Sequence, residues 1–204
     1  MKTQAFDNLV AEIKNRANAQ AAPFLVALDG RSGTGKTTLS KRLGQALGAS
    51  VILGDDFYSG GQLEEWTNMS PRAKVDHCMD WRRMRKEALE PLINGHTAKW
   101  RTFNWATGIG LSEHLITCQP APIIILDGAF STRPELSDIV NLSVLLRVPD
   151  DIRRQRLRDR EGEDFMSKWH KVWDEGEDYY FARMRPDSSF DILIDALDIE
   201  TEEK

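Results

Sequence analysis

Apolar residues along the chain occur in short runs separated by longer amphipathic stretches. Residues 23–29 read Pro-Phe-Leu-Val-Ala-Leu-Asp, a run bounded by proline and glycine that predicts a strand buried on both faces. Runs of the same kind occupy residues 51–53, 123–126 and 144–148, and a weaker run occupies residues 190–194. The apolar pattern therefore predicts a set of buried strands distributed along the chain.

Between these runs, apolar residues recur at helical spacing. Phe6, Leu9, Val10 and Ile13 fall on one face of a predicted amphipathic helix over residues 5–19. Other stretches with helical character cover residues 38–47, 80–94, 151–160 and 164–183. Because strands alternate with helices along the chain, we predict an α/β fold whose central parallel sheet is covered by helices on both faces.

Residues 97–120 interrupt this alternation. The segment carries Trp100, Phe103 and Trp105 together with Gly108 and Gly110, and it predicts a β-hairpin or a loop excursion from the main sheet. A small substrate flap and a packed surface hairpin both agree with this pattern. The aromatic rings could stack on a ligand ring, and packing into the core would explain them equally well.

Composition narrows the classes of protein that remain. The 204 residues are 41% hydrophobic and 29% charged, which is typical of one globular domain, and we expect that domain to span residues 1–204. The formal net charge of −5 argues against nucleic acid or an anionic membrane as a partner. Only two cysteines occur, without a CxxC pair, and no apolar run approaches the ~18 residues of a membrane span. A cytoplasmic location is therefore expected.

The most specific motif follows the first predicted strand and opens the next predicted helix. Gly30-Arg-Ser-Gly-Thr-Gly35-Lys36-Thr37 matches the phosphate-loop pattern G-x-x-x-x-G-K-[ST]. The glycines let the backbone N–H groups approach phosphate oxygens, Lys36 can reach the β- and γ-phosphates, and the Thr37 hydroxyl can bind Mg²⁺. The sequence thus predicts a site for ATP or GTP with Mg²⁺, made of Gly30, Arg31, Ser32, Gly33, Thr34, Gly35, Lys36, Thr37 and Thr38.

Acidic residues follow two of the other predicted strands. Asp127 ends the run 123–126, where a carboxylate would approach the Mg²⁺, although a turn residue could also stand there. Asp55 and Asp56 follow the run 51–53, at the edge of a parallel sheet where ligands bind. A carboxylate at this place can accept the proton of an attacking hydroxyl or help to position the metal. We favour Asp55 as the base, while Asp56 could cap a helix.

A dense run of arginines follows the fourth predicted strand. Five arginines fall within eight residues of this net acidic chain, and Arg153, Arg156 and Arg160 share one face of the predicted helix. Cationic side chains that close over a transferring phosphoryl group stabilise the charge of the transition state. A solvated face held by ion pairs would explain any single arginine equally well. For the run as a whole we favour a lid over residues 151–164.

Taken together, these segments resemble the uridine kinase-like branch of P-loop kinases, which also includes phosphoribulokinase, pantothenate kinase and nicotinamide riboside kinase. The resemblance extends in order from about Pro23 to Asp195. After the phosphate loop, Leu53-Gly-Asp-Asp-Phe-Tyr58 is similar to the strand and D-x-F-Y element of that family, and Val75-Asp-His77 is similar to its F-D-H segment. Residues 80–92 resemble its next helix, and residues 124–128 its strand followed by E-G.

This resemblance implies a three-layer P-loop NTPase fold and a kinase that uses ATP and Mg²⁺. It implies that Asp55 accepts the proton of the substrate hydroxyl and that Asp76, or alternatively Asp80, binds substrate hydroxyls. Tyr58, Phe103 and Trp105 complete the expected acceptor site. Asp127 stands where the family has glutamate, and Gly108 and Gly110 stand where the nucleoside kinases have a His and an Arg that meet the base.

The expected function is therefore transfer of the γ-phosphoryl group of ATP to a hydroxyl of a nucleoside or ribosyl-type metabolite. Lys36, Asp55, Arg153, Arg156 and Arg160 are the candidate catalytic residues, and Thr37 and Asp127 are the candidate metal ligands. Two alternatives remain open at the level of the sequence. One is a kinase for pantothenate or a sugar phosphate, and the other is a nucleotide-binding switch or hydrolase without an acceptor.

Overall fold

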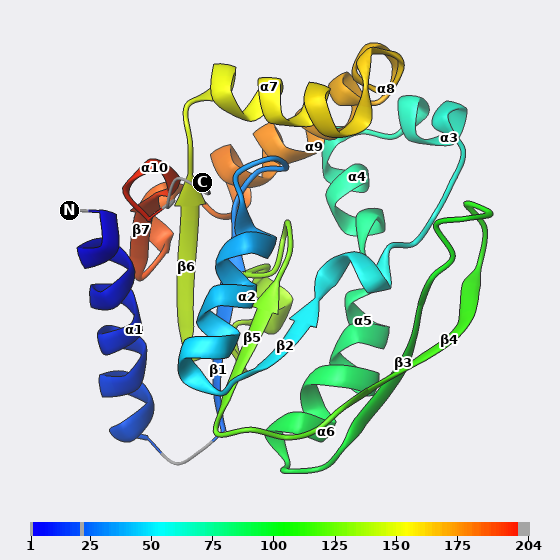
Figure 1. Cartoon of the computed structure of the whole chain (residues 1–204). Coiled ribbons are helices and arrows are strands. Elements are labelled where there is room, and N and C mark those ends of the chain that lie inside the picture. Colours follow the sequence, from blue (N-terminus) through cyan, green and yellow to red (C-terminus); the bar gives the residue numbers. More distant parts are fainter. Residues whose placement is uncertain (1, 21–22, 200–204) are drawn as a thin grey trace.

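A five-stranded parallel sheet forms the centre of the computed structural model, which describes residues 2–20 and 23–199 (Figure 1). The strand order across the sheet is β2-β5-β1-β6-β7. The strands are β1 (Phe24–Asp29), β2 (Ser50–Leu53), β5 (Ile123–Asp127), β6 (Leu142–Arg147) and β7 (Ile192–Asp195). All five predicted strands are confirmed, and the bounds of each differ from the prediction by no more than a few residues.

Alternate residues of the central strands supply two separate apolar cores. On β1, Leu25 faces one core, whereas Val26 and Leu28 face the other. On β5, Ile124 and Ile125 divide in the same way. Since both faces of these strands are buried, helices must cover the sheet on both sides, and the predicted three-layer α/β architecture is confirmed.

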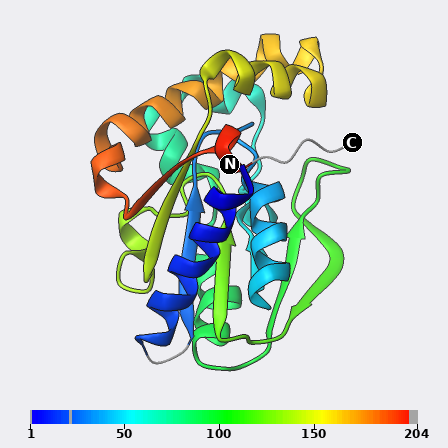
Figure 2. The same ribbon diagram turned by 60° about the vertical axis from the view of Figure 1, so that its left-hand side comes forward.

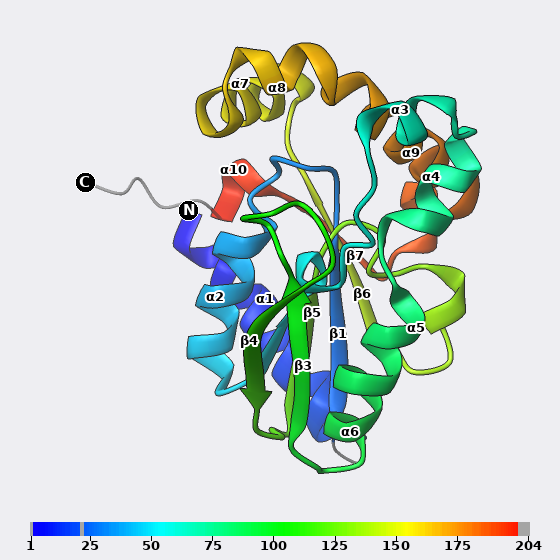
Figure 3. The same ribbon diagram turned by 90° about the vertical axis from the view of Figure 1, so that its right-hand side faces the viewer.

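One face of the sheet is covered by α1 (Lys2–Asn18), α2 (Lys36–Leu47) and α10 (Ala196–Ile199) (Figure 2). Helices on the other face are α3 (Leu63–Asn68), α4 (Pro71–Cys78), α5 (Trp81–Met84), α6 (Glu90–Ile93) and α9 (His170–Tyr179). Two further helices, α7 (Asp150–Glu161) and α8 (Glu163–Lys168), extend with α9 across the edge where the strands end (Figure 3).

Two of the predicted helices are interrupted in the structure. Between α5 and α6 lies a π-helical segment, Arg85–Leu89, and Pro91 follows it. Proline cannot donate the regular backbone hydrogen bond and its ring crowds the preceding turn, so the α-helical pattern breaks there. The helix predicted over residues 164–183 is instead α8, α9 and a second π-helical segment, Tyr180–Met184.

The excursion predicted over residues 97–120 is a hairpin of β3 (Ala98–Phe103) and β4 (Leu111–Cys118). It forms a separate antiparallel sheet that stands beside the main one (Figure 1). Trp100 and Phe103 are buried in the core, whereas Trp105 at the tip is 61% exposed. Core packing therefore explains the first two rings, and only Trp105 offers most of its surface to solvent.

None of the helices within residues 2–20 and 23–199 combines the length and the apolar character needed to cross a membrane.

Candidate active site

The predicted phosphate loop connects β1 to α2 at the carboxyl edge of the sheet, as the motif requires. Gly30 has a φ of 149°, and the backbone carbonyl of Leu146 on β6 lies in the space that a side chain would need. Any other residue at this position would push the loop away from the sheet. Both the close packing against β6 and the backbone conformation therefore require glycine at the first position of the motif.

Asp29, the last residue of β1, anchors two neighbouring loops at this edge of the sheet. Its buried carboxylate accepts hydrogen bonds from the N–H groups of Gly30 (2.8 Å) and Phe130 (3.0 Å). It also accepts from the N–H and Oγ1–H groups of Thr132 (3.0 and 2.7 Å) and from the Tyr180 hydroxyl (2.8 Å). A single side chain thus joins the start of the phosphate loop to the loop that follows β5.

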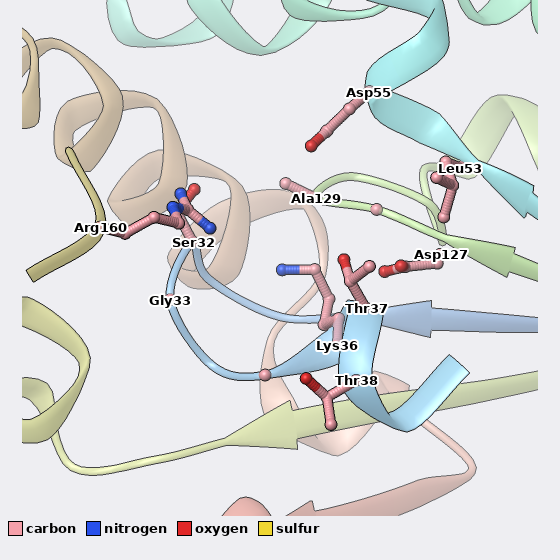
Figure 4. A pocket seen from close by; sticks show the side chains of 12 residues that line it. Ser32, Gly33, Lys36, Thr37, Thr38, Leu53, Asp55, Asp127, Ala129 and Arg160 are labelled. Atoms are coloured by element: carbon pink, nitrogen blue, oxygen red, sulfur yellow. The ribbon is translucent and has the colours of Figure 1, made fainter. Parts of the chain in front are cut away.

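A cavity of about 250 Å³ opens beside the phosphate loop (Figure 4). It collects residues from the phosphate loop, from the ends of β2 and β5, and from the last turn of α7. The lining residues are Ser32, Gly33, Gly35, Lys36, Thr37, Thr38, Leu53, Asp55, Asp127, Gly128, Ala129 and Arg160. The structure therefore brings together most of the residues that the sequence assigned to nucleotide, metal and base.

Lys36 begins α2 and is largely buried. Its Nζ atom donates to the carbonyl oxygens of Gly30 (2.7 Å) and Arg31 (3.0 Å), which hold the ammonium group within the curve of the loop. An ammonium group with three donors that lines the cavity can meet phosphate oxygens from that position.

Asp127 is the last residue of β5 and lies next to the first turn of α2 (Figure 4). Burial raises the pKa of its carboxyl above the ordinary value, while the charge of Lys36 and hydrogen bonds from Thr37 and Ser40 oppose that rise. The Ser40 Oγ atom donates to Oδ2 at 3.0 Å. A divalent cation beside this carboxylate would favour its charged form.

The donor set of Thr37 and Asp127 fits Mg²⁺. Hydroxyl and carboxylate oxygens are the ligands that this hard cation prefers, and it usually combines few protein ligands with substrate phosphates. Across the part of the chain that the structure describes, no three His, Cys, Asp or Glu side chains gather as a metal-binding group. A cation held by Thr37 and Asp127 would complete its ligands with phosphate oxygens and water.

Asp55 and Asp56 lie in a 3₁₀ turn, Gly54–Phe57, that follows β2. Asp55 lines the cavity, whereas the Oδ2 atom of Asp56 accepts a hydrogen bond from Nε1 of Trp100 on the hairpin at 2.8 Å. Burial raises the pKa of Asp56, and the Trp100 hydrogen bond opposes the rise. Asp56 makes no helix cap here, so the cap suggested by the sequence is wrong and the hairpin is its partner.

The arginine run forms α7, but its members have different surroundings. Arg160 lines the cavity from the last turn of the helix. Arg153 is buried, and its Nη2 atom pairs with Asp150 (2.6 Å) and Asp174 (3.0 Å). Of the three arginines that the sequence proposed to close over the phosphates, Arg160 lines the cavity, and Arg153 and Arg156 do not.

Several predicted acceptor residues form an aromatic group near the hairpin tip. Tyr58 stacks on Trp105 with ring centroids 5.1 Å apart and an interplanar angle of 9°. Phe103 contacts both rings edge-on at 4.9 Å. Trp66 and Trp173 extend the group to α3 and α9. This group presents one open ring surface, that of Trp105.

Asp76 and Asp80 are not among the residues that line the cavity. Asp76 pairs with Arg72 at 2.8 Å on α4 and lies 3.6 Å from the Arg133 guanidinium. Asp80 is the N-cap of α5, where its Oδ1 atom accepts the N–H of Arg83 at 3.0 Å. A helix-capping interaction therefore accounts for Asp80 without a ligand.

Two polar contacts of the phosphate loop region were not predicted. Ser40 lies one helical turn after Lys36, and this i,i+4 spacing is a signal that could have placed its hydroxyl on the same helix face, beside Asp127. Glu177 on α9 accepts two hydrogen bonds from Ser32. Nothing local in the sequence points to Glu177, because its partner lies 145 residues earlier.

Comparisons with known proteins agree with this fold. A family model described as an AAA domain matches residues 26–168. The uridine kinase of Deinococcus deserti is 28% identical over 144 residues, which cover 67% of this chain and 69% of that protein. The uridine kinase of Ligilactobacillus salivarius is 28% identical over 153 residues, covering 72% and 71%.

Solved structures extend the likeness to nearly the whole fold. A putative fructose transport system kinase from Silicibacter sp. TM1040 is 22% identical with a TM-score of 0.72, covering 93% of this chain and 98% of that one. A possible uridine kinase from Bacillus stearothermophilus is 21% identical with a TM-score of 0.64, covering 90% and 100%. The family model places the chain in the AAA domain family, and with the phosphate loop the relatives and the shared fold support a uridine kinase-like P-loop kinase.

Proposed function

We propose that the protein transfers the γ-phosphoryl group of ATP, in the presence of Mg²⁺, to a hydroxyl of a nucleoside or ribosyl-type metabolite. The observation that carries this proposal is the composition of one cavity, which collects Lys36, Asp127, Asp55 and Arg160 from four separate elements. A phosphate-binding lysine, a metal-binding carboxylate and a second carboxylate at one edge of a parallel sheet support phosphoryl transfer to a bound hydroxyl.

Each of these residues has a defined task in the proposed reaction. Lys36 and the loop amides bind the phosphate oxygens, and Thr37 and Asp127 hold Mg²⁺, which neutralises charge on those oxygens when it is bound. Asp55 accepts the proton as the acceptor hydroxyl attacks the γ-phosphorus, and the bond from that phosphorus to the β–γ bridging oxygen breaks as ADP leaves. Arg160 approaches the transferred group from α7 and stabilises the charge that its oxygens share in the transition state.

The nucleoside class is supported by two observations. The curated relatives reported above are uridine kinases, and Trp105 carries an exposed ring surface stacked on Tyr58 at the hairpin tip. An indole supported from behind by a second ring is a suitable surface for a planar heterocycle. We expect the hairpin, over residues 97–120, to act as the acceptor flap and residues 151–164 as the lid of a single kinase domain spanning residues 1–204.

Acceptor-dependent release of ADP tests this proposal. With MgATP, the panel consists of uridine, cytidine, nicotinamide riboside, pantothenate, ribulose 5-phosphate, fructose, D-glycerate and a blank without acceptor. Release above the blank with a nucleoside or ribosyl compound is the expected result. ADP release only with one of the other acceptors would contradict the nucleoside or ribosyl class and identify a different acceptor. ADP release at the same rate in every sample, including the blank, would indicate a hydrolase.

A further inference from the structure

Helix α7 lies directly on the phosphate loop. A Cβ atom on Gly33 would come within 2.9 Å of the carbonyl oxygen of Arg153 and 3.0 Å of Cγ of Leu157. Gly33 also has a φ of 84°, which side chains rarely adopt. The Arg153 Nη1 atom donates to the carbonyl oxygen of Ser32 at 3.3 Å. The loop and the arginine helix are thus packed backbone against backbone at this point.

Glu177 reaches the same part of the loop from α9. Its side chain is only 3% exposed, and its Oε1 atom accepts both the N–H and the Oγ–H of Ser32 at 2.7 Å. Ser32 lines the cavity, whereas Glu177 is not among the cavity residues. The carboxylate therefore holds a cavity-lining residue of the loop without lining the cavity itself.

The charge of Glu177 is balanced by arginines on both neighbouring elements. Its Oε2 atom makes no hydrogen bond within the described residues, but lies 3.7 Å from Arg153 Nη1 and 3.9 Å from Arg31 Nη1. Arg153 in turn is bound by Asp150 on its own helix and by Asp174 on α9. A buried network therefore connects α7, α9 and the first half of the phosphate loop.

We infer that Glu177 is a positioning residue, and that with Arg153 it fixes the phosphate loop and α7 as one unit. This inference rests on the proposed use of the loop for ATP. A loop with three glycines samples many backbone conformations when it is not restrained. By accepting the Ser32 N–H, Glu177 sets the orientation of the peptide between Arg31 and Ser32. Arg153 holds the next peptide through the Ser32 carbonyl, so the amides that follow are directed at phosphate oxygens in advance of binding.

Arg153 thereby receives a different role from the one that its place in the arginine run suggests. Its guanidinium does not approach the transferred group but neutralises Glu177 and holds α7 on the loop. Since Arg160 lies two turns further along the same helix, the position of α7 also decides where Arg160 meets the cavity.

Variants of Glu177 test the inference without using the phosphoryl transfer reaction. Glu177→Ala removes both hydrogen bonds to Ser32, whereas Glu177→Gln keeps an acceptor but loses the charge that faces Arg153. Glu12→Gln, at a 43% exposed side chain that pairs with Arg16 on α1, is the matched control. The measurements are the equilibrium affinity for ATP, hydrogen exchange of the amides of residues 30–38 without nucleotide, and thermal unfolding.

We expect Glu177→Ala to weaken ATP binding by about tenfold and to accelerate exchange in the loop by a similar factor, because a hydrogen bond to a charged group has been lost. Glu177→Gln should show the same changes to a smaller extent, about threefold. The Glu12→Gln control should match the natural protein in both measurements. The changes in ATP affinity and in loop exchange should be larger than a loss of overall stability, measured by thermal unfolding, would cause by itself.

Natural ATP affinity and natural loop exchange in a folded Glu177→Ala protein would overturn the inference, even if its stability fell. If that variant does not fold, unchanged affinity and exchange in Glu177→Gln would overturn it instead. The outcome is independent of the acceptor. A protein that transfers phosphate to no acceptor would contradict the proposed function, yet weakened ATP binding in the Glu177 variants would still support the positioning role.

Discussion

Asp55 and Asp56 are adjacent in the chain, but only Asp55 lines the cavity. Asp55→Asn should lower kcat by about 10²–10⁴-fold while ATP binding is retained, because the variant cannot accept the proton of the acceptor hydroxyl. Asp56→Asn is the matched control, since Asp56 is held by Trp100 away from the cavity. Steady-state kinetics with the acceptor found in the panel measure the difference.

Full activity in Asp55→Asn would show that another group takes the proton. Equal losses in both variants would instead indicate that the turn Gly54–Phe57 had been disturbed.

The ionisation of Asp127 in the cavity should make the stability of the folded protein depend on pH. Burial raises the pKa of this carboxyl, so the folded protein favours its protonated form. Its contribution to stability is therefore most favourable below the ordinary pKa of aspartate and is lost as pH rises through the raised pKa. Asn cannot ionise, so at neutral pH and without Mg²⁺ we expect Asp127→Asn to melt about 2–4 °C higher, the shift that ~1 kcal/mol gives in a chain of this size.

Thermal unfolding with and without Mg²⁺ and ATP, measured between neutral and acidic pH, checks this prediction. The difference between the two proteins should shrink on acidification, and the variant should lose the stabilisation that MgATP gives the natural protein. An Asn variant that is less stable at neutral pH would mean that the attraction between Asp127 and Lys36 outweighs burial.

For single residues, the sequence predicted which side chains lie at the cavity better than it predicted the partners that those side chains bind. The motif spacing was enough to place Lys36, Thr37 and Asp127 around one cavity, because each follows a strand of the same sheet. The sequence favoured Asp55 over Asp56 as the base but could not predict the partner of Asp56, since its hydrogen bond with Trp100 forms across 44 residues of chain. Long-range hydrogen bonds of this kind leave no local pattern.

Helix α7 carries arginines with opposite surroundings at its two ends. Arg153 is buried against the phosphate loop in the first turn, and Arg160 lines the cavity from the last. Arg160→Ala should therefore lower kcat by about 10²-fold or more, with a smaller change in the affinity for ATP, because a cation that serves the transition state is lost.

Arg158→Ala is a suitable control on the same helix, because Arg158 is 44% exposed and pairs with Glu163. Comparison of kcat and ATP affinity for the two variants distinguishes a specific role of Arg160 from a general effect of charge. If kcat fell by the same factor in both variants, α7 would act through its net charge alone, without a specific role of Arg160.

At the scale of elements, the periodicity of apolar residues predicted the strands and the long helices, but not the short ones. Helices α3 and α4 were missed, although Ser70 accepts the N–H of Ala73 as an N-cap and Pro71 stands at the first position of α4. These two signals were present in the sequence. An eight-residue helix is too short for the periodicity itself to stand out.

The order of the strands belongs to the whole molecule and was not predictable from any single segment. Alternating strands and helices predicted a parallel sheet, while the order β2-β5-β1-β6-β7 depends on which strands pair across the centre. That order places the ends of β1, β2 and β5 side by side. The cavity therefore depends on the strand order as much as on the phosphate-loop motif.

Ligand binding to such a cavity should stabilise the entire fold. ATP at one hundred times its dissociation constant adds ~2.7 kcal/mol to the stability of the folded state, which corresponds to a rise of about 5–10 °C in Tm for a chain of this length. Lys36→Met should abolish most of that rise, since the ammonium group that meets the phosphates is lost. Thermal unfolding with and without MgATP provides the measurement.

Comparison with unliganded protein controls for the direct cost of the Lys36→Met change, because Lys36 also binds the carbonyls of Gly30 and Arg31. A variant that retained the full nucleotide-dependent rise would remove Lys36 from the phosphate site.

The hairpin of β3 and β4 has its own sheet, and it shares no strand pairing with the five strands that carry the phosphate site. Its tip around Trp105 can thus change in length and composition without altering the register of the catalytic strands. With the hairpin as the proposed acceptor flap, a new acceptor could be acquired through this one interchangeable module while the strands around the phosphate loop stay unchanged. Grafting the tips of kinases with known acceptors onto this hairpin would be a direct way to redesign its substrate range.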